Sequence, residues 1–254
     1  MNGKLKAVIF DVDGVIADTE KDGHRVAFNH VFEEEGLDVR WDIEKYGVLL
    51  KIAGGKERLR TLVYSDEFKK DVSDKEEYIL KMHKRKTEIY KEIVSQGKLP
   101  GRPGVKRLIK ETREADLKLG VASTSHEKSV KAVIKTILGE DILELFDVIL
   151  AGDVVKQKKP SPEIYELSAK SLKVLPGNCV VIEDTRNGLL SAKGAGMVCV
   201  ITPSYYSRDE NFDEADLVVS GLGDPDGKTT QVIKSKVSLP NFKYVTIDIL
   251  RRLF

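Results

Sequence analysis

The amino-acid sequence predicts an α/β fold, in which an open parallel sheet carries one inserted helical domain. Short apolar runs that do not alternate with polar residues suit parallel strands covered on both faces. Stretches with helical periodicity separate these runs. One long stretch, from about Glu20 to Gly97, contains only helical patterns. The expected strands are the apolar runs that begin at Ala7, Leu119 and Cys179 and those within residues 146–150 and 215–219.

The inserted helices divide the chain into two predicted domains. Helical patterns cover residues 22–35, 43–50, 56–63 and 74–95, and no strand pattern interrupts them. The segment 99–104, rich in Pro and Gly, then punctuates the chain before the strands resume. We expect a core domain of residues 1–18 and 102–254 and an all-helical cap domain of residues 19–101. The sequence of residues 221–254 suggests only a short helix from about Tyr244.

Composition excludes several classes of function. The 254 residues carry 42 basic and 41 acidic side chains, so no overall field favours nucleic acid or a membrane as a partner. The length permits an ample core, and we expect a monomer. Cys179 and Cys199 lie in apolar runs and are expected to be reduced core residues. No apolar run reaches the length of a membrane span, and residues 1–4 show no signal or transit peptide.

Polar residues follow the apolar runs where the carboxyl ends of the strands are expected. Asp11 and Asp13 follow the first run, Ser123 ends the second, and Glu183 with Asp184 ends a later one. Ligands of open α/β sheets bind outside the carboxyl ends of the strands, so these side chains should meet at one place. One carboxylate at such a site can attack a substrate while another transfers a proton.

Each of these motifs also has a purely structural interpretation. Asp11 or Asp13 would then be a turn or N-cap residue, as Asp often is. The hydroxyl cluster Ser123-Thr124-Ser125 would cap a helix that starts near His126-Glu127. The pair Glu183-Asp184 would cap a helix that begins near Thr185.

The order of the motifs resembles the haloacid dehalogenase-like (HAD) hydrolases. Asp11-Val12-Asp13-Gly14 is followed by Ser123, by Lys159-Pro160 and by Glu183-Asp184, and the match covers roughly residues 5 to 220. Four motifs in order, each on the right kind of element, are far more specific than one short acidic motif. The resemblance implies a Rossmann-like core with an inserted C1-type helical cap.

The resemblance also implies roles for the catalytic residues. Asp11 would attack phosphorus and form an aspartyl-phosphate, and Asp13 would be the general acid and base. Ser123 and Lys159 would bind the phosphoryl group. Of the two adjacent lysines, the family pattern favours Lys159, which directly precedes proline, over Lys158.

The expected cofactor is Mg²⁺, because a carboxylate cannot approach an anionic phosphate ester without a cation between them. Mg²⁺ prefers a few carboxylate oxygens, water and a phosphate oxygen. The resemblance implies Asp11, Asp184 and the backbone carbonyl of Asp13 as ligands. Glu183 would hold a metal-bound water or lie behind the ligands.

The cap is expected to select the substrate. Gly54-Gly55-Lys56-Glu57-Arg58 opens a helix with amides and cations that suit an anion. Lys86 resembles in position the substrate-facing lysine of the β-phosphoglucomutase relatives. Glu20 and His24 are four residues apart and are expected on one face of the first cap helix, where they would contact sugar hydroxyls or control the general acid. Each basic residue alone would be a solvated charge, and His24 alone a structural residue. The expected substrate-binding residues are Glu20, His24, Gly54, Gly55, Lys56, Arg58 and Lys86, with the backbone amides of Thr124 and Ser125.

Three segments resemble the CbbY branch of the HAD family. They are Asp18 to Arg25, Gly54 to Arg58, and the loop Ala151 to Pro160. This resemblance implies a phosphatase that converts xylulose-1,5-bisphosphate, an inhibitor of Rubisco, to xylulose-5-phosphate. The implied location is the plastid stroma for a photosynthetic eukaryote and otherwise the cytoplasm. Alternatives are a β-phosphoglucomutase-like mutase, a small-phosphate phosphatase and a non-catalytic sugar-phosphate-binding module.

Overall fold

The computed structural model describes residues 4–52 and 54–254, which form two compact units. One unit comprises the chain up to Asp18 together with Pro100–Phe254, and the other comprises Thr19–Leu99. The helical unit therefore ends at Leu99, and the larger unit resumes at Pro100 and not at the expected residue 102. The expectation that no leader precedes the first strand concerns Met1 to Gly3, which lie outside the described residues.

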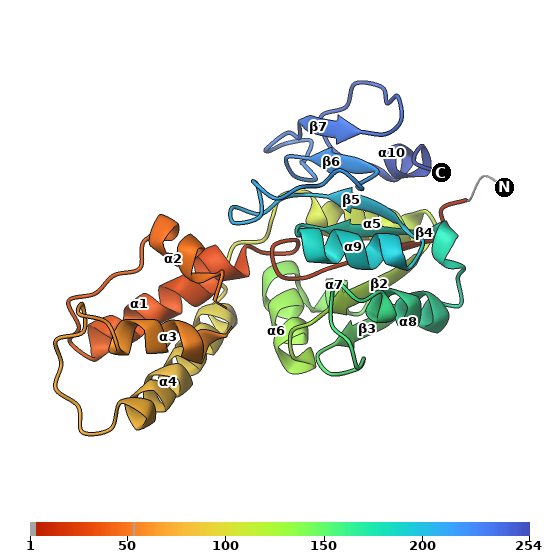
Figure 1. Cartoon of the computed structure of the whole chain (residues 1–254). Helices are drawn as coiled ribbons and strands as arrows, with labels where there is room; N and C mark the ends of the chain where they lie inside the picture. Colours follow the sequence, from red (N-terminus) through yellow and green to blue (C-terminus); the bar gives the residue numbers. More distant parts are fainter. Residues whose placement is uncertain (1–3, 53) are drawn as a thin grey trace. The chain divides into compact units, whose positions relative to one another are not determined.

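A mixed, mainly parallel sheet forms the centre of the larger unit (Figure 1). Within the described residues its strand order is β3-β2-β1-β4-β5-β6-β7, and only β7 runs antiparallel to its neighbour. This arrangement confirms the predicted fold class. The strands are β1 (Ala7–Phe10), β2 (Lys118–Ser123), β3 (Val148–Ala151), β4 (Cys179–Glu183), β5 (Val198–Ile201), β6 (Leu217–Val219) and β7 (Val232–Ser235).

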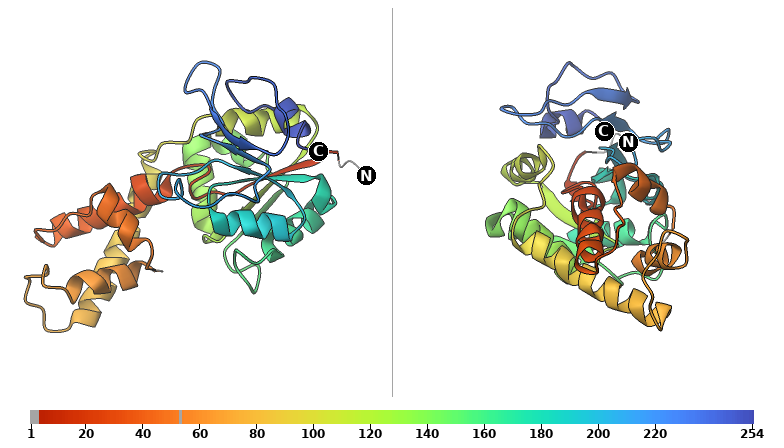
Figure 2. Two further views of the ribbon diagram at one scale, coloured as in Figure 1. Left: turned by 45° about the horizontal axis from the view of Figure 1, so that its top comes forward. Right: turned by 90° about the vertical axis from the view of Figure 1, so that its left-hand side faces the viewer.

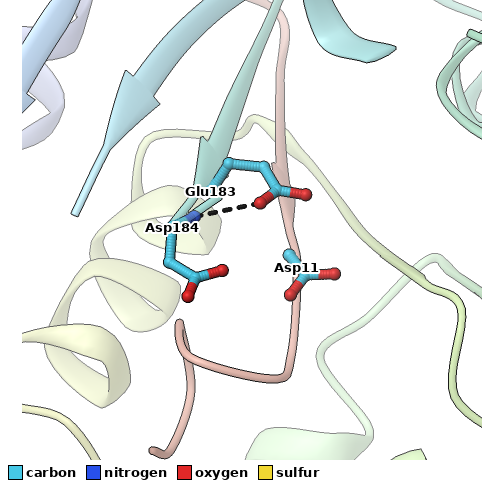
Figure 3. A group of neighbouring side chains, drawn as sticks. All are labelled: Asp11, Glu183 and Asp184. Atoms are coloured by element: carbon cyan, nitrogen blue, oxygen red, sulfur yellow. Dashed lines mark hydrogen bonds between the residues drawn. The ribbon is translucent and has the colours of Figure 1, made fainter. Parts of the chain in front are cut away.

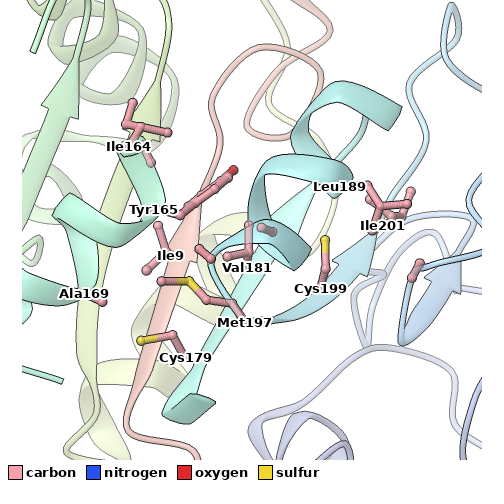
Figure 4. Packing of buried hydrophobic residues seen from close by; sticks show 14 of the residues in the cluster. Ile9, Ile164, Tyr165, Ala169, Cys179, Val181, Leu189, Met197, Cys199 and Ile201 are labelled. Atoms are coloured by element: carbon pink, nitrogen blue, oxygen red, sulfur yellow. The ribbon is translucent and has the colours of Figure 1, made fainter. Parts of the chain in front are cut away.

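Helices cover both faces of the sheet, so the central strands are buried throughout. Ile9 and Val181 point into a cluster with Tyr165 of α8 and Leu189 of α9 (Figure 4). Alternate strand residues point to the opposite face, where α5 contacts β2. The helices of this unit are α5 (Val105–Glu114), α6 (Glu127–Leu138), α7 (Glu140–Leu143), α8 (Glu163–Leu172), the 3₁₀ turn η2 (Pro176–Asn178), α9 (Arg186–Gly194) and α10 (Ile247–Arg251).

The two cysteines lie in this core. Cys179 and Cys199 are both free thiols that are buried in the same apolar cluster (Figure 4). Burial raises the pKa of the Cys179 thiol to about 12. The predicted place of both cysteines in the core is therefore confirmed.

The C-terminal segment contains a strand that its sequence did not indicate. After β6 the chain returns as the antiparallel strand β7, which pairs with β6 across an irregular register. Val232 and Ile233 of β7 are exposed, so this strand lacks the continuous burial of the central strands β1 and β4. The final helix α10 begins at Ile247, with Thr246 as its N-cap, and contacts α5.

The smaller unit is entirely helical among its described residues, and Figure 2 shows its helices from two further sides. Asp42 caps α2 and Asp74 caps α4, each by accepting a hydrogen bond from a backbone amide three residues on. The elements are the π-helical turn η1 (Thr19–His24), α1 (Arg25–Glu34), α2 (Ile43–Leu49), α3 (Gly55–Val63) and α4 (Lys75–Ser95).

Aromatic rings form the core of the helical unit. Trp41 is buried and lies 4.9 Å from the Phe28 ring and 4.8 Å from the Phe32 ring, measured between centroids. The Asn29 amide donates to the Trp41 carbonyl, and the Asn29 side-chain carbonyl accepts from the Trp41 backbone amide. These paired hydrogen bonds fix the segment between α1 and α2 against α1. No helix in the described part of the chain has the length and apolarity needed to cross a membrane.

Gly104 provides a test of how the larger unit is packed. It has a φ of +86°, and a Cβ atom there would lie 2.3 Å from the Gly223 carbonyl oxygen. We expect Gly104→Ala to lower the free energy of unfolding by about 1–3 kcal/mol for the left-handed backbone, with a similar further loss from the overlap. Gly196→Ala is the matched control, because Gly196 has a φ of +74° and no atom within 4 Å of the new methyl group. Equal losses in urea titrations of the two variants would contradict this account.

Candidate active site

Three buried carboxylates meet at the carboxyl ends of β1 and β4. Asp11 follows β1, while Glu183 is the last residue of β4 and Asp184 comes next (Figure 3). One carboxylate oxygen from each lies within 4.8 Å of the others. The parallel pairing of β1 with β4 places Phe10 beside Ile182, so both strands end at the same level. The structure thus brings Asp11 together with an adjacent acidic pair that lies far along the sequence.

Lys159 balances part of this negative charge. Its ammonium group donates to Asp11 Oδ1 at 2.7 Å and to Glu183 Oε1 at 2.6 Å. A third hydrogen bond, of 3.0 Å, goes to the Ala122 carbonyl at the end of β2. An ammonium group has three donors, so these contacts use all of them. Lys158 is half exposed and pairs with Asp153, away from the carboxylates.

Glu183 is held from several sides. Its Oε1 accepts from Lys159 and, at 2.8 Å, from the hydroxyl of the buried Tyr165. Its Oε2 accepts from the backbone amides of Asp184 and Thr185. Gly188 in the first turn of α9 leaves room for this carboxylate, because a Cβ there would lie about 2 Å from it. The sequence did not reveal Tyr165, since an apolar helix position and a site position look alike.

Asp184 lies against the loop that follows Asp11. A Cβ on Gly14 would lie 2.0 Å from Asp184 Oδ2, and Gly14 has a φ of +81°. Both the space and the backbone angle therefore require glycine there. On its other side Asp184 faces the hydroxyl of Ser207, which lies 3.5 Å from Oδ2.

Burial, and after it the neighbouring charges, shift the pKa values of the acidic residues at this site. Burial raises the pKa of Asp11 to about 8 although the Lys159 ammonium opposes the shift. Burial, Glu183 and Asp11 together hold the pKa of Asp184 well above its ordinary value. Burial also disfavours the charged form of Glu183, but attraction to Lys159 outweighs it and lowers the pKa. An added cation would relieve this repulsion.

The donor set fits a magnesium ion. Asp11 and Asp184 offer carboxylate oxygens, which are the ligands that Mg²⁺ prefers. Glu183 accepts hydrogen bonds at both of its oxygens, so its geometry favours a place behind the metal ligands. The cluster is buried, so a bound cation would be poorly screened by salt and would interact strongly with these carboxylates.

The hydroxyls after β2 are arranged differently from the expectation. Ser125 Oγ donates to Asp13 Oδ2 at 2.5 Å, and the Ser125 amide donates to Ser123 Oγ at 3.1 Å. The helix begins only at Glu127, with His126 as its N-cap. The expected helix start near His126-Glu127 is therefore confirmed, but the cap is the His126 imidazole, which accepts from the Lys128 amide, and not a hydroxyl of residues 123–125. Thr124 and Ser125 lie before the helix, so their amides do not belong to its first turn.

The helical unit contains a separate polar cluster around Tyr46. The buried Tyr46 hydroxyl donates to Glu20 Oε2 at 2.7 Å and accepts from Arg58 Nη1 at 3.1 Å. Arg58 Nε also donates to the Ile52 carbonyl at 3.1 Å. The sequence indicated Glu20 and Arg58 but not Tyr46, whose aromatic side chain fits an ordinary core position.

Lys86 and His24 form a second contact in this unit. Lys86 Nζ lies 2.9 Å from His24 Nδ1 and 4.6 Å from the centre of the Phe28 ring. Burial lowers the pKa of Lys86 to about 8, against the attraction of Glu20. Glu20 and His24 belong to the π-helical turn η1, not to an α-helix as expected. Glu20 nevertheless contacts Tyr46 and Arg58, and His24 contacts Lys86, so both side chains lie among the polar groups of this unit.

Gly54, Gly55 and Lys56 stand at the start of α3. Gly54 is the N-cap residue with a φ of +98°, and Lys56 is exposed. A Cβ on Gly55 would lie 2.9 Å from His83 Nε2, so His83 borders this turn. Burial, with Lys86 and Lys56 nearby, lowers the pKa of His83. The sequence assigned His83 no role.

Known proteins match the part of the chain that carries the carboxylate site. A family model described as haloacid dehalogenase-like hydrolase matches residues 5–196. The chain belongs to the haloacid dehalogenase-like hydrolases. Like its family, the protein is a hydrolytic enzyme, and its relatives identify it as a phosphatase.

Relatives named CbbY are similar to this HAD hydrolase over most of its length. A CBBY-like protein of Arabidopsis thaliana is 46% identical over 223 residues, which are 86% of this chain and 70% of that protein. Protein CbbY of Cereibacter sphaeroides is 40% identical over 226 residues, 88% of this chain and 95% of that protein.

Solved structures of HAD hydrolases give the same result. The crystal structure of a CbbY variant from Rhodobacter sphaeroides, in complex with xylulose-1,5-bisphosphate, has a TM-score of 0.69 and 40% identity, and covers 85% of this chain and 94% of its own. A putative β-phosphoglucomutase from Thermotoga maritima has a TM-score of 0.64 and 29% identity, and covers 78% of this chain and 85% of its own.

Gly188 tests whether the geometry of Glu183 matters for catalysis. We expect Gly188→Ala to displace the Glu183 carboxylate and, with it, Lys159, and to lower kcat by about 100-fold, as misplaced catalytic groups often do. The control is Gly194→Ala in the same helix, where the new methyl group would touch Pro162 at an ordinary 3.4 Å. Steady-state phosphatase kinetics on folded protein would measure both. Similar kcat values for the two variants would contradict the proposed importance of this contact.

Proposed function

We propose that this protein is a Mg²⁺-dependent phosphatase of sugar bisphosphates and that its substrate is xylulose-1,5-bisphosphate. The observation that carries the proposal is the buried group of Asp11, Asp184 and Lys159 at the ends of β1, β4 and the loop after β3. The similarity to CbbY, whose structure holds this bisphosphate, supports the choice of substrate.

In the first half-reaction Asp11 would act as the nucleophile. One of its carboxylate oxygens attacks phosphorus, and the bond from phosphorus to the sugar oxygen breaks. Asp13 donates its proton to that leaving oxygen. The hydrogen bond from Ser125 to Asp13 Oδ2 holds the acid in one orientation. Lys159, by exchanging one of its three hydrogen bonds, and the Ser123 hydroxyl would bind the oxygens of the transferring group.

In the second half-reaction the aspartyl-phosphate is hydrolysed. Asp13, now a carboxylate, takes a proton from a water molecule whose oxygen attacks phosphorus. The bond between phosphorus and the Asp11 oxygen breaks, which releases inorganic phosphate and restores both carboxyl groups. Asp11, Asp184 and the backbone carbonyl of Asp13 would hold Mg²⁺, which when bound supplies positive charge for the phosphate oxygens.

The helical unit would provide the contacts that distinguish a bisphosphate. Arg58 and Lys86 are cations held in place by Tyr46, Glu20 and His24. Lys56 adds a third, exposed cation at the start of α3, where backbone amides also favour anions. We propose that this group, with Gly54 and Gly55, binds the second phosphate and that Glu20 and His24 contact sugar hydroxyls.

The remaining proposals concern the protein's setting. We propose that it acts as a monomer on a small molecule. Because a similar protein occurs in Arabidopsis thaliana, we also propose a plastid stromal location if the source is a photosynthetic eukaryote.

The acid–base role of Asp13 can be separated from binding. We expect Asp13→Asn to lower kcat by about 100-fold or more, since proton transfer is lost, while KM changes little because the shape is kept. The measurement is phosphate release from xylulose-1,5-bisphosphate and, as a near isomer, ribulose-1,5-bisphosphate. An unchanged kcat in the variant would contradict the role of Asp13.

The intact enzyme should strongly prefer xylulose-1,5-bisphosphate to its near isomer. Activity on β-glucose-1-phosphate without phosphate release would point to a mutase.

The second-phosphate proposal is tested with Lys56, which is exposed and has no packing role. We expect Lys56→Ala to lower kcat/KM about tenfold or more for a sugar bisphosphate, by loss of a charged contact, and little for phosphoglycolate. Lys84→Ala, which removes another exposed lysine of the same unit, is the control. Equal losses on both substrates would show that Lys56 does not bind a second phosphate.

A further inference from the structure

Arg102 has an unusual set of partners for a charged side chain. Its Nη1 donates to the carbonyls of Gly14 and Thr202, the latter at 2.7 Å, and its Nη2 donates to the Pro203 carbonyl at 2.9 Å. A further contact of 3.3 Å reaches the Thr202 hydroxyl. The guanidinium group is thus occupied mainly by backbone oxygens from two separate loops.

The first of these loops carries the catalytic aspartates. Gly14 directly follows Asp13, whose backbone carbonyl belongs to the proposed metal site. The Arg102 amide also donates to the Ile16 carbonyl at 2.8 Å, and Ala17 pairs with Gly101 as an isolated bridge. The segment that begins at Pro100 is therefore hydrogen-bonded to the loop that follows β1.

The second loop reaches Asp184. Thr202 and Pro203 are followed by Ser204, whose hydroxyl lies 3.0 Å from that of Ser207. The Ser207 hydroxyl in turn lies 3.5 Å from Asp184 Oδ2. The Thr202 amide is anchored to the Glu183 carbonyl at 2.8 Å. Arg102 thus fixes the start of the segment that places two hydroxyls beside a proposed metal ligand.

We propose that Arg102 is a positioning residue that sets the affinity of the metal site by clamping these two loops together. The inference rests on the proposed function, because it concerns the same metal site. The planar guanidinium suits this task, since its donors point in fixed directions and can serve several carbonyls at once. A lysine would keep the charge near Asp184 but would lose the fork, that is, the fixed arrangement of guanidinium donors.

Binding of Mn²⁺ to the substrate-free protein is the direct test. Electron paramagnetic resonance of free Mn²⁺ measures this binding without any turnover. We expect Arg102→Met and Arg102→Lys both to weaken binding by at least about tenfold, as losses behind metal ligands often do. In turnover assays we expect a raised half-saturating Mg²⁺ concentration and partial recovery of kcat at high Mg²⁺, with little change in the KM for substrate.

Arg107→Met is the matched control. Arg107 also donates to a backbone carbonyl, that of Gly223 at 2.7 Å, and pairs with Glu111 and Asp224, none of which belongs to the carboxylate site. It should leave the Mn²⁺ affinity unchanged. If the Arg102 variants do not fold, Ser207→Ala removes the last hydroxyl of the chain of contacts and should also weaken Mn²⁺ binding.

Three results would overturn the clamp, each for a different reason. Unchanged Mn²⁺ affinity in folded Arg102 variants would overturn the inference and leave the proposed phosphatase intact. Normal affinity in Arg102→Lys alone would show that charge and not the fork matters, which would also overturn it. Failure of the intact protein to bind Mn²⁺ would overturn the metal site itself, and the inference with it.

Discussion

Three buried carboxylates and one ammonium group crowd the ends of β1 and β4, and this concentration of charge governs the rest of the site. The hydrogen bonds of Lys159 go to Asp11, to Glu183 and to a carbonyl, so the described ion pairs of this ammonium group leave out Asp184. Burial first, and then the neighbouring carboxylates, raise the pKa values of Asp11 and Asp184. Such an excess of carboxylates favours a cation, because its arrival relieves repulsion that the fold alone leaves, and a bound cation then attracts an anionic substrate.

The sheet provides the rigidity that this crowding requires. β1 and β4 are adjacent and buried on both faces, and their parallel register ends them at one level. Where side chains crowd most, the chain uses glycine: Gly14 makes room for Asp184 and Gly188 makes room for Glu183. Arg102 then joins the surrounding loops through backbone carbonyls. The site therefore depends on packing of backbone against carboxylate as much as on the charged residues themselves.

The sequence predicted β1, β2, β3, β4 and β6 and the helical insertion, because apolar runs and helical periodicity are local signals. It did not predict β5, although this strand is buried. It could not distinguish Tyr165 or Tyr46 from ordinary core residues, since their roles depend on which polar group the fold brings to each hydroxyl. Arg102 gave no signal for the same reason. The identity of the N-cap before Glu127 was missed because His126, an uncommon N-cap, follows three hydroxyl residues that cap helices more often. β7 was missed because its residues are exposed.

The central claim is that Asp11 forms a covalent bond to phosphorus during turnover, and intact-mass measurement after rapid acid quench tests it most directly. Protein mixed with Mg²⁺ and xylulose-1,5-bisphosphate should transiently gain the mass of one phosphoryl group, and peptide mapping should place it on Asp11. The Asp11→Asn variant should show no such gain while still binding the substrate in a thermal-shift assay. Phosphate release by the intact enzyme with no phosphorylated protein at any quench time, or a phosphoryl group on another residue, would contradict the account.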